Sequence, residues 1–350
     1  MSQFQINSIT DKSGTSGPVI AGVSTNNSTG CMIIPAGPTE HRGGRGRGIV
    51  GGGRDPAASG ADITIDMHEI ATTGDAVDFG DLMKANTGAK GGGFGSATRA
   101  ILAGGYNPSP TSAVTTQIQY VVMSSGGGAN DFGDLRIAKN GIIPGSNDTR
   151  GILLGGATPD YTSEMSSINI QSLGDDSSYG SALEGRIRNG SCAQNGTIGL
   201  FGGGQGPSTN YYSIVSYVFA TRGSGTKFGE LSQNTTSNTA VSSGIRGVWA
   251  GGNTPAVLDI IEYVTIATEG DAIDFGDLTV ARRNLAGCTN RIRGTFCGGH
   301  IGASGSGDNR NTIDFITIAS TGNATDFGDL LVIRRCSNSG GSDAHGGLIQ

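Results

Sequence analysis

The chain has 350 residues, of which 63 are glycine and only 15% are charged, and its formal net charge is -6. The glycines follow no triplet period and the apolar residues are regularly placed, which excludes collagen and a disordered chain. The acidic balance, the lack of an apolar run of about 18 residues and a start without a basic-then-apolar layout lead us to expect no nucleic-acid partner, no membrane insertion and no secretion signal.

Residues 1–46 do not carry the repeat that fills the rest of the chain. They are polar and contain turn signals such as D-K-S-G and S-G-P, with only short apolar pairs such as Val19-Ile20. Because such a segment buries little apolar surface by itself, we expect a partner, another copy of the chain or the remaining domain to order it. We therefore predict an attachment or oligomerisation segment at 1–46 and a single larger domain at 47–350.

An internal repeat of about 50 residues begins at residue 47. Each copy opens with an apolar segment that ends in a glycine doublet. These segments are RGIVGGG (47–53), RAILAGG (99–105), RGILLGG (150–156), IGLFGGG (198–204), RGVWAGG (246–252) and RGTFCGG (293–299). Segments that alternate apolar and polar residues around an aromatic follow, at 63–71, 118–123, 214–220, 260–267 and 312–319.

Each copy closes with an aromatic-glycine-acid motif. The six versions are TGDAVDFGDL (73–82), ANDFGDL (129–135), SSYGSAL (177–183), TKFGEL (226–231), EGDAIDFGDL (269–278) and GNATDFGDL (322–330). With a Gly/Ser/Asn-rich segment such as RRNLAGC (282–288), each repeat contains four short strands. The doublet strand is apolar at consecutive positions, which indicates a sheet that packs on both faces. The predicted fold is all-β, a β-propeller of four-stranded blades with a short N-terminal extension.

Arginine and acid positions vary together among the copies. Arginine stands five residues before the doublet except at Ile198 in repeat 4, and the acid after F-G is missing only at Ser181 in repeat 3. A buried ion pair that loses one partner leaves an uncompensated charge, so joint loss predicts pairing between successive blades. The predicted interblade pairs are Asp81 with Arg99, Asp134 with Arg150, Glu230 with Arg246, and Asp277 with Arg293.

The same rule predicts how the ring closes. Asp329 has no later doublet strand and would need Arg47 as its partner, which closes six blades. Residues 332–340 match 280–288 and are predicted to supply the first strand of the blade that begins at 47. The tail 344–350 resembles the start of another doublet strand, so seven blades remain an alternative, with 332–350 as the closing segment.

Over about 47–350, the R-x-x-x-x-G-G strand and the following I-D-F/Y strand resemble the kelch repeat. F-G-D-L stands where kelch proteins place a tryptophan, whereas the single tryptophan here, Trp249, is on a different strand. This resemblance implies a kelch-like propeller.

The opening INSITDKSGTSGPV, the segment ARRNLAG and the repeated T-x-G-x-A-x-D-F-G-D-L are similar to virion structural proteins of marine, cyanobacterial tailed bacteriophages. The resemblance implies a tail-fibre, baseplate or capsid-surface component that assembles in the host cytoplasm and binds other virion proteins through residues 1–46. By analogy with symmetric fibres, we expect a homo-oligomer and take a trimer as the working model.

The motifs give little support to catalysis. D-F-G recurs in phase with the strands and lacks the other kinase motifs. The five cysteines show no C-x-x-C spacing and the four histidines no H-x-x-x-H spacing, so we predict neither a metal site nor a cofactor. Two acid triplets, Asp75-Asp78-Asp81 and Asp271-Asp274-Asp277, leave calcium as a minor alternative. We expect a protein that is not an enzyme.

The segments after the glycine doublets differ from copy to copy, and they lie on one face because they join equivalent strands. Their tyrosines, prolines and small polar residues suit adaptable binding. The candidates for contact with a host-surface glycan or protein are Tyr106, Tyr161, Tyr211, Tyr212 and His300. The alternatives are that these side chains only cover strand ends, that the protein is a cytoplasmic scaffold for protein partners, or that it acts on glycans as an enzyme.

Overall fold

The structure is a computed structural model that describes residues 24–26, 31–33, 46–54, 62–84, 92–107, 113–185, 187–302 and 308–344. The chain divides into two units, Met1–Glu40 and His41–Gln350. In the first unit, β1 (Ser24–Asn26) and β2 (Cys31–Ile33) form an antiparallel pair. The rest of the predicted attachment segment up to residue 45 lies outside the described residues, as does the tail from residue 345.

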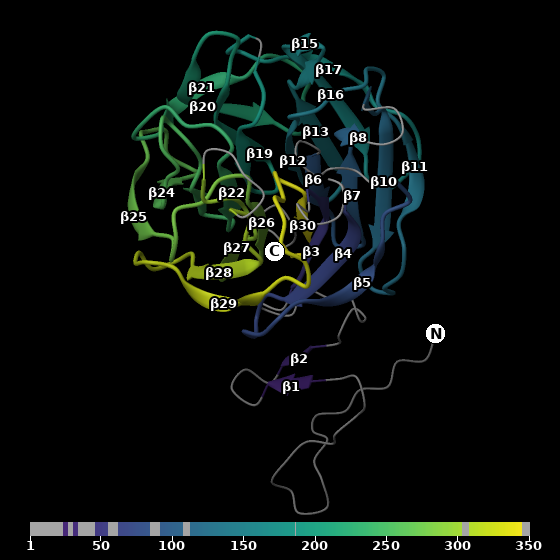
Figure 1. Ribbon diagram of the computed structural model, residues 1–350, viewed down its shortest axis with the longest axis vertical. Coiled ribbons are helices and arrows are strands. Elements are labelled where there is room, and N and C mark those ends of the chain that lie inside the picture. The colour runs from purple at the N-terminus through teal and green to yellow at the C-terminus, as the bar shows by residue number, and fades with distance from the viewer. Residues whose placement is uncertain are drawn as a thin grey trace, which may run out of the picture. The chain divides into compact units, whose positions relative to one another are not determined.

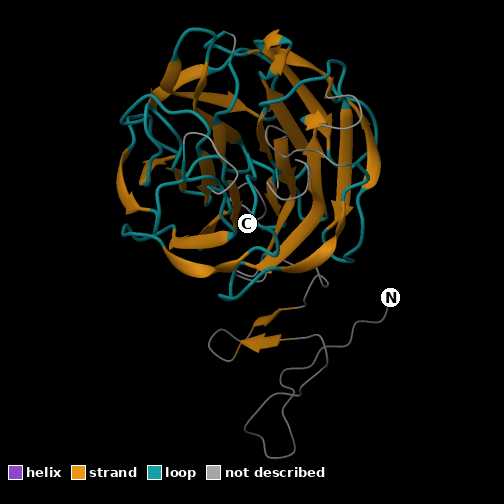
Figure 2. Ribbon diagram, in the orientation of Figure 1, coloured by secondary structure: helices purple, strands orange, loops and turns teal. Residues whose placement is uncertain are grey.

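Six four-stranded antiparallel sheets form a six-bladed β-propeller in the second unit (Figure 1), and every regular element described there is a strand (Figure 2). Blade 1 contains β30 (Gly340–Ser342), β3 (Arg47–Gly53), β4 (Asp62–Glu69) and β5 (Val77–Asp81); blade 2 contains β6 (Gly92–Gly95), β7 (Arg99–Ala103), β10 (Gln117–Val122) and β11 (Asn130–Asp134); blade 3 contains β12 (Ile143–Ser146), β13 (Arg150–Leu154), β16 (Glu164–Asn169) and β17 (Ser177–Ser181).

Blades 4 to 6 repeat this order. Blade 4 contains β18 (Ser191–Gln194), β19 (Ile198–Gln205), β20 (Asn210–Val218) and β21 (Thr226–Glu230); blade 5 contains β22 (Thr239–Ser242), β23 (Arg246–Ala250), β24 (Ile260–Thr265) and β25 (Ile273–Asp277); blade 6 contains β26 (Ala286–Thr289), β27 (Arg293–Cys297), β28 (Thr312–Thr317) and β29 (Thr325–Asp329). The predicted fold class and the six-bladed alternative are confirmed.

The two ends of the propeller meet in blade 1, where β30 pairs with β3. Closure by the C-terminal segment is therefore as predicted, but the strand lies at Gly340–Ser342 and not within 332–340. The crossover, which we define as the connection from the fourth strand of one blade to the first strand of the next, contains two left-handed residues here, Ser337 (φ 44) and Asn338 (φ 62). The crossover into blade 6 contains one, Asn284 (φ 57), so the extra turn shifts the closing strand along the chain.

The core consists of six apolar clusters, one at each seam, the name we use for the interface between neighbouring blades. The doublet strands lie between these clusters, which explains their consecutive apolar residues. The aromatic residue of each F-G-D-L motif is buried in the seam with the following blade. These residues are Phe79, Phe132, Tyr179, Phe228, Phe275 and Phe327.

The glycine of the F-G-D motif lets the outer edges of neighbouring blades come together. Gly80 has a φ of 143, and a Cβ there would lie 2.4 Å from the carbonyl carbon of Gly127 in the next blade. The Gly127 amide donates to Phe79 O (2.7 Å) and the Ala129 amide to Asp81 O (2.7 Å). Equivalent backbone bonds hold the outer strands of five blades to the next blade, so these edges are not free to pair with another chain, whereas in blade 3 the Tyr179 hydroxyl donates to Thr221 O (2.5 Å) of the next blade.

The predicted acid-arginine pairs are wrong, because the strand register separates their members. Along β4, Arg47 pairs with Glu69 and Asp81 pairs with Thr64, so arginine and acid positions lie about 16 Å apart at opposite ends of a blade. The same register recurs in every blade, and it separates each set of partners. The separated partners are Asp81 and Arg99, Asp134 and Arg150, Glu230 and Arg246, Asp277 and Arg293, and Asp329 and Arg47.

The arginines do connect blades, but through carbonyl oxygens at the end of the third strand of the next blade. The contacts are Arg47 to Met123 O (2.5 Å), Arg99 to Ile170 O (2.7 Å), Arg150 to Phe219 O (2.6 Å), Arg246 to Ile318 O (2.9 Å) and Arg293 to Ala71 O (2.8 Å). A backbone acceptor exists whatever the sequence, so the acid and the arginine vary independently.

A different acid bridges the blades. It belongs to the G-D-A segment before the fourth strand, and its carboxylate accepts the amide hydrogen of the F-G-D acid in the preceding blade. The bonds are Asp134 N to Asp175 Oδ1 (2.9 Å), Glu230 N to Asp271 Oδ1 (3.0 Å) and Asp329 N to Asp75 Oδ1 (3.0 Å). Asn323 replaces this acid for Asp277 N (3.1 Å). The acid of this segment therefore links neighbouring blades, a role that the sequence analysis assigned to the F-G-D-L acid and the doublet-strand arginine.

Each crossover is also fixed at the amide of its second residue, which donates to a side chain of the next blade. The six bonds are Met83 N to Gln119 Oε1 (2.7 Å), Arg136 N to Asp176 Oδ1 (2.7 Å), Leu183 N to Tyr217 Oη (3.0 Å), Ser232 N to Glu262 Oε2 (2.8 Å), Thr279 N to Asp314 Oδ2 (3.2 Å) and Leu331 N to Asp66 Oδ2 (3.0 Å). Two of these aspartates also bind fully buried arginines, Asp314 to Arg282 (2.6 Å) and Asp66 to Arg334 (2.9 Å).

Candidate binding face

The connections between the second and third strands of the blades lie on one face of the propeller, which we call the hairpin face. In blade 2 the connection forms β8 (Tyr106–Asn107) and β9 (Ala113–Val114), and in blade 3 it forms β14 (Ala157–Thr158) and β15 (Asp160–Tyr161). In blade 4 the two long strands continue outward to the pair Gln205 and Asn210. The predicted loops are therefore short hairpins that differ from blade to blade.

The hairpins are anchored by a backbone bridge between the residue after each doublet and a crossover. The five bridges join Arg54 to Arg335, Asn140 to Ala157, Arg188 to Gln205, Thr236 to Asn253, and Arg283 to His300. This anchoring fixes where each hairpin begins, while its length and sequence stay variable.

The four candidate tyrosines lie on three successive blades of this face, but they differ in exposure. Tyr212 is 43% exposed, whereas Tyr106, Tyr161 and Tyr211 are half-buried. The Arg188 guanidinium lies 4.4 Å from the centre of the Tyr161 ring, and the Tyr211 hydroxyl donates to Glu184 O (3.3 Å). Both contacts are to the crossover between blades 3 and 4, so these two rings brace that crossover and Tyr212 presents the most open surface.

The prediction that His300 contacts a ligand at the surface is wrong, because the structure buries this residue completely. Its Nε2 lies 2.7 Å from Arg335 Nη2 and its backbone bridges Arg283. His300 occupies the position directly after the glycine doublet, which in the other blades also bridges a crossover. The sequence placed it in the variable segment, but structurally it belongs to the scaffold.

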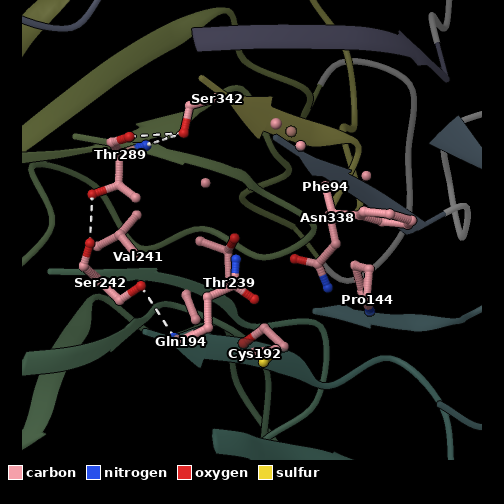
Figure 3. Close-up of a pocket in the computed structure, with 17 residues that line it drawn as sticks. Phe94, Pro144, Cys192, Gln194, Thr239, Val241, Ser242, Thr289, Asn338 and Ser342 are labelled. Carbon is pink, nitrogen blue, oxygen red and sulfur yellow. Dashed lines mark hydrogen bonds between the residues drawn. The ribbon is translucent and has the colours of Figure 1, made fainter. Parts of the chain in front are cut away.

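A small polar cavity lies at the centre of the propeller, where the first strands of the blades converge (Figure 3). Its volume is about 50 Å³, enough for a few waters at about 10–15 Å³ each but not for a sugar ring. Labelled residues such as Gln194, Ser242, Thr289 and Ser342 surround it (Figure 3).

Hydrogen bonds between the first strands form a belt around this cavity. The sequence analysis did not predict them. Five of the six first strands end in a polar side chain that bonds to a neighbouring first strand, and β6 ends in Gly95, whose carbonyl accepts one of these bonds. The bonds are Ser146 Oγ to Gly95 O (2.9 Å), Ser146 N to Gln194 Oε1 (2.8 Å), Gln194 N to Ser242 Oγ (3.1 Å), Thr289 Oγ1 to Ser242 O (3.1 Å) and Ser342 Oγ to Thr289 O (2.7 Å). The recurring Ser, Thr or Gln at this position was the available signal.

The acid triplets considered for calcium do not form a cluster of ligands. Asp75 and Asp271 are each engaged by the amide of the preceding blade, and Asp81 and Asp277 lie further along the outer strand. Among the described residues, a group of three side chains suited to holding a metal ion occurs elsewhere, at His68, Cys288 and Cys297.

Comparison of the sequence with models of known protein families finds no match, and comparison with curated proteins finds no similar sequence. Within the described part of the chain, no helix has the length and apolar character needed to cross a membrane. The function is therefore inferred from the fold and its hairpin face.

Proposed function

We propose that the protein is a non-enzymatic structural component of a tailed-bacteriophage particle, attached through residues 1–46 and contacting the host surface through its hairpin face. The support for a phage origin is the similarity of the opening segment and the repeated F-G-D-L motif to virion proteins of marine phages. The support for a contact role is that the scaffold repeats from blade to blade while the hairpins on one face vary.

The observation that carries the proposal is the contrast between the six-fold scaffold and its hairpins. The outer edges of five blades repeat the same backbone bonds and all six crossovers bond to a side chain of the next blade, while the connections on one face differ in length, pairing and composition. Recognition residues are commonly placed on loops held by a rigid scaffold. A binding face built in this way changes its specificity without changing its fold.

The crossovers add apolar surface to the same face. Soon after the fourth strand, five of the six crossovers expose a large apolar side chain. These side chains, which we call the crossover rim, are Met83, Ile137, Leu183, Val280 and Leu331. Exposed apolar groups that recur at the second or third residue of the crossovers favour a protein-contact surface. The central cavity of about 50 Å³ adds support for a non-catalytic role, because enzyme pockets are typically about 300–1,000 Å³.

The first test locates the protein. Purified phage particles carrying a label at Gln350 are imaged, alongside particles from a variant that lacks residues 1–46. We expect label on the fibre, baseplate or shell of the parent particle and its loss from the variant, whose isolated propeller keeps its β-sheet circular dichroism. Unlabelled parent particles would contradict the proposal and favour a cytoplasmic scaffold.

A second test addresses the hairpin face. Tyr212→Ala removes an exposed aromatic side chain from that face, whereas Ile245→Ala removes a 69% exposed side chain from the turn between β22 and β23 on the opposite face. We expect slower adsorption of the Tyr212 variant to host cells and an unchanged rate for the Ile245 variant. Equal rates for both would exclude Tyr212 from the contact. Turnover of a host polysaccharide by the purified chain would instead support the enzymatic alternative.

A further inference from the structure

We propose that His68, Cys288 and Cys297 form a zinc site at the seam that closes the ring. His68 lies on β4 of blade 1, Cys288 on β26 and Cys297 on β27 of blade 6. One ligand atom from each side chain lies within 4.8 Å of the other two. The sequence argued against zinc because neither C-x-x-C nor H-x-x-x-H occurs, but ring closure assembles the ligands from distant segments.

The three side chains are buried, and the two sulfurs and His68 Nδ1 make only long contacts or none. The Cys288 sulfur lies 3.5 Å from Ile49 O, and the Cys297 sulfur lies 3.9 Å from Thr295 Oγ1. His68 Nε2 is 2.9 Å from Thr295 Oγ1, while the buried Nδ1 has no hydrogen-bond partner. A dry group of thiols with an unsatisfied imidazole nitrogen is unfavourable by itself and suits a soft cation.

The internal repeats provide an independent observation. The strand register makes His68 equivalent to Val121, Ile168, Tyr217, Val264 and Ile316. It likewise makes Cys297 equivalent to Gly51, Ala103, Leu154, Gly202 and Ala250. An imidazole and a thiol, which none of these equivalent positions carries, therefore meet at one seam, and that seam joins the two ends of the propeller.

Charge favours zinc over other soft cations. Zn²⁺ binds thiolates and a neutral imidazole, so two cysteinates and His68 give a site with no net charge, as a fully buried location requires. Cu(I) with the same ligands would leave a net negative charge. Zinc distances of about 2.0–2.3 Å place ligand atoms roughly 3.5 Å apart, so binding requires the three atoms to approach by roughly 1 Å.

A metal at this place would link blade 6 to blade 1 directly. The other five seams join blades that are consecutive in the chain, whereas this one depends on non-covalent pairing of β30 with β3. A zinc ion would therefore hold the ring closed, and its loss would lower the unfolding temperature of the whole propeller. This inference does not depend on the proposed virion role.

The test measures metal bound to the full chain after purification under reducing conditions without chelator. We expect about one zinc per chain, and a cobalt-substituted form that shows thiolate-to-cobalt charge transfer and tetrahedral d–d bands. Cys288→Ser and Cys297→Ser should each weaken zinc binding at least tenfold. Cys192→Ser is the matched control, because Cys192 is also a buried thiol but lies on β18 at another seam; it should bind zinc like the parent chain.

A second measurement on the unaltered chain covers variants that fail to fold. A chelator should lower the thermal unfolding temperature and make Cys288 and Cys297 more reactive toward alkylation, and added zinc should reverse both effects. A chain that binds neither added zinc nor cobalt, or serine variants that bind zinc as tightly as Cys192→Ser, would overturn the proposal. Stoichiometric binding of Cu(I) without zinc would overturn the choice of metal, and a disulfide between Cys288 and Cys297 in the isolated chain would overturn the site.

Discussion

The closing seam between blades 6 and 1 and the seam between blades 3 and 4 reach the same geometry with different chemistry. At the closing seam, the buried Arg334 binds Asp62 (2.8 Å) and Asp66 (2.9 Å). At the seam between blades 3 and 4, the apolar cluster contains Phe201 and Tyr217, whose rings meet edge to face with centroids 5.2 Å apart. At this seam the Leu183 amide of the crossover donates to Tyr217 Oη and not to a carboxylate.

The difference follows from how each seam is formed. Blades 3 and 4 are consecutive, so the chain itself holds them together and apolar packing suffices. Blades 6 and 1 lie at opposite ends of the repeat, and their seam must select one register without such help. Buried ion pairs are sensitive to geometry, because a misplaced charge loses its partner in a medium that does not solvate it. The seam between the consecutive blades 5 and 6 also contains a buried pair, Arg282 with Asp314, so buried charge is not confined to the closure. We infer that at the closing seam the charges help to select the register, which at the seam of blades 3 and 4 the chain connection and the apolar packing determine.

The largest effect should come from removing the arginine of the closing seam. Arg334→Met leaves Asp62 and Asp66 buried without their cation, and breaking one side of a buried pair costs about 3–5 kcal/mol. Burial already raises the pKa of Asp66 against the lowering effects of Arg334 and of the Leu331 amide, so without Arg334 a single backbone hydrogen bond is left to stabilise the carboxylate. Denaturant unfolding followed by circular dichroism measures this loss.

The double variant Arg334→Met, Asp66→Leu provides the control. Removing both charges should recover a substantial part of the lost stability, because an apolar replacement of a buried pair is often neutral. A single variant that loses less than about 1 kcal/mol would show that the closure does not depend on this pair.

The next effect should depend on pH and arise directly after β30, the strand that closes blade 1. Asp343 Oδ1 accepts the Arg47 amide (2.8 Å), and burial raises the pKa of Asp343 from 3.8 to about 6. The stability that this acid contributes is present below pH 3.8 and is lost as the pH rises through about 6. Asp343→Asn keeps the acceptor without the charge, so we expect the variant to be more stable than the parent by about 2 kcal/mol at pH 7 and equal to it below the unfolded-state pKa.

Comparing the two proteins at each pH isolates this carboxyl group. Burial lowers the pKa of His68 at the same seam to about 4, which destabilises the fold as the pH falls from 6.5, but both proteins share that effect. A constant difference between parent and variant from acid to neutral pH would contradict the assignment to Asp343.

A smaller effect should distinguish the outer edges of the two seams. At Gly328 in the closing seam φ is 147 and an added Cβ would lie 2.5 Å from Gly74 O, whereas at Gly180 it would lie 3.0 Å from Gly223 O. Gly328→Ala should cost about 1–3 kcal/mol in unfolding free energy through strain and displacement of the next blade, and Gly180→Ala less. Equal losses would show that the edges of the two seams are equally tight.

Much of this architecture could be predicted because repeated contacts leave repeated residues. Six motifs in phase indicated the blades, and consecutive apolar residues indicated burial between them. The role of Asp81 could not be predicted, since its backbone makes the contact and its side chain was taken as a partner for Arg99. A backbone carbonyl accepts a hydrogen bond whatever its side chain, so such a contact requires no matching pair of residue types that the sequence could reveal.

The candidate site was less predictable than the scaffold. The variable segments did locate the hairpin face, but His300 and Tyr212 look alike in sequence, each following a doublet strand. Their burial differs because His300 lies at the position that bridges a crossover, and only three-dimensional pairing reveals that bridge. The group of His68, Cys288 and Cys297 was missed for the opposite reason, since its members come from segments joined only by ring closure.

The smallest difference in unfolding free energy should be found between variants of the arginines at the two seams. This comparison tests whether the closing seam differs in all its contacts or only in its buried charges. Arg150 donates to Phe219 O (2.6 Å) at the seam of blades 3 and 4, and Arg293 donates to Ala71 O (2.8 Å) at the closing seam. Both are half-buried and both bind backbone carbonyls.

Arg150→Met and Arg293→Met should each lower the free energy of unfolding by about 1 kcal/mol, with values that agree within about 0.5 kcal/mol in parallel denaturant titrations. Equal losses for the two variants would mean that these two seams differ only in the buried carboxylates that pair with Arg334 at the closing seam. A clearly larger loss for Arg293→Met would mean that every contact at the closure carries more of the stability, and that the ring opens there first.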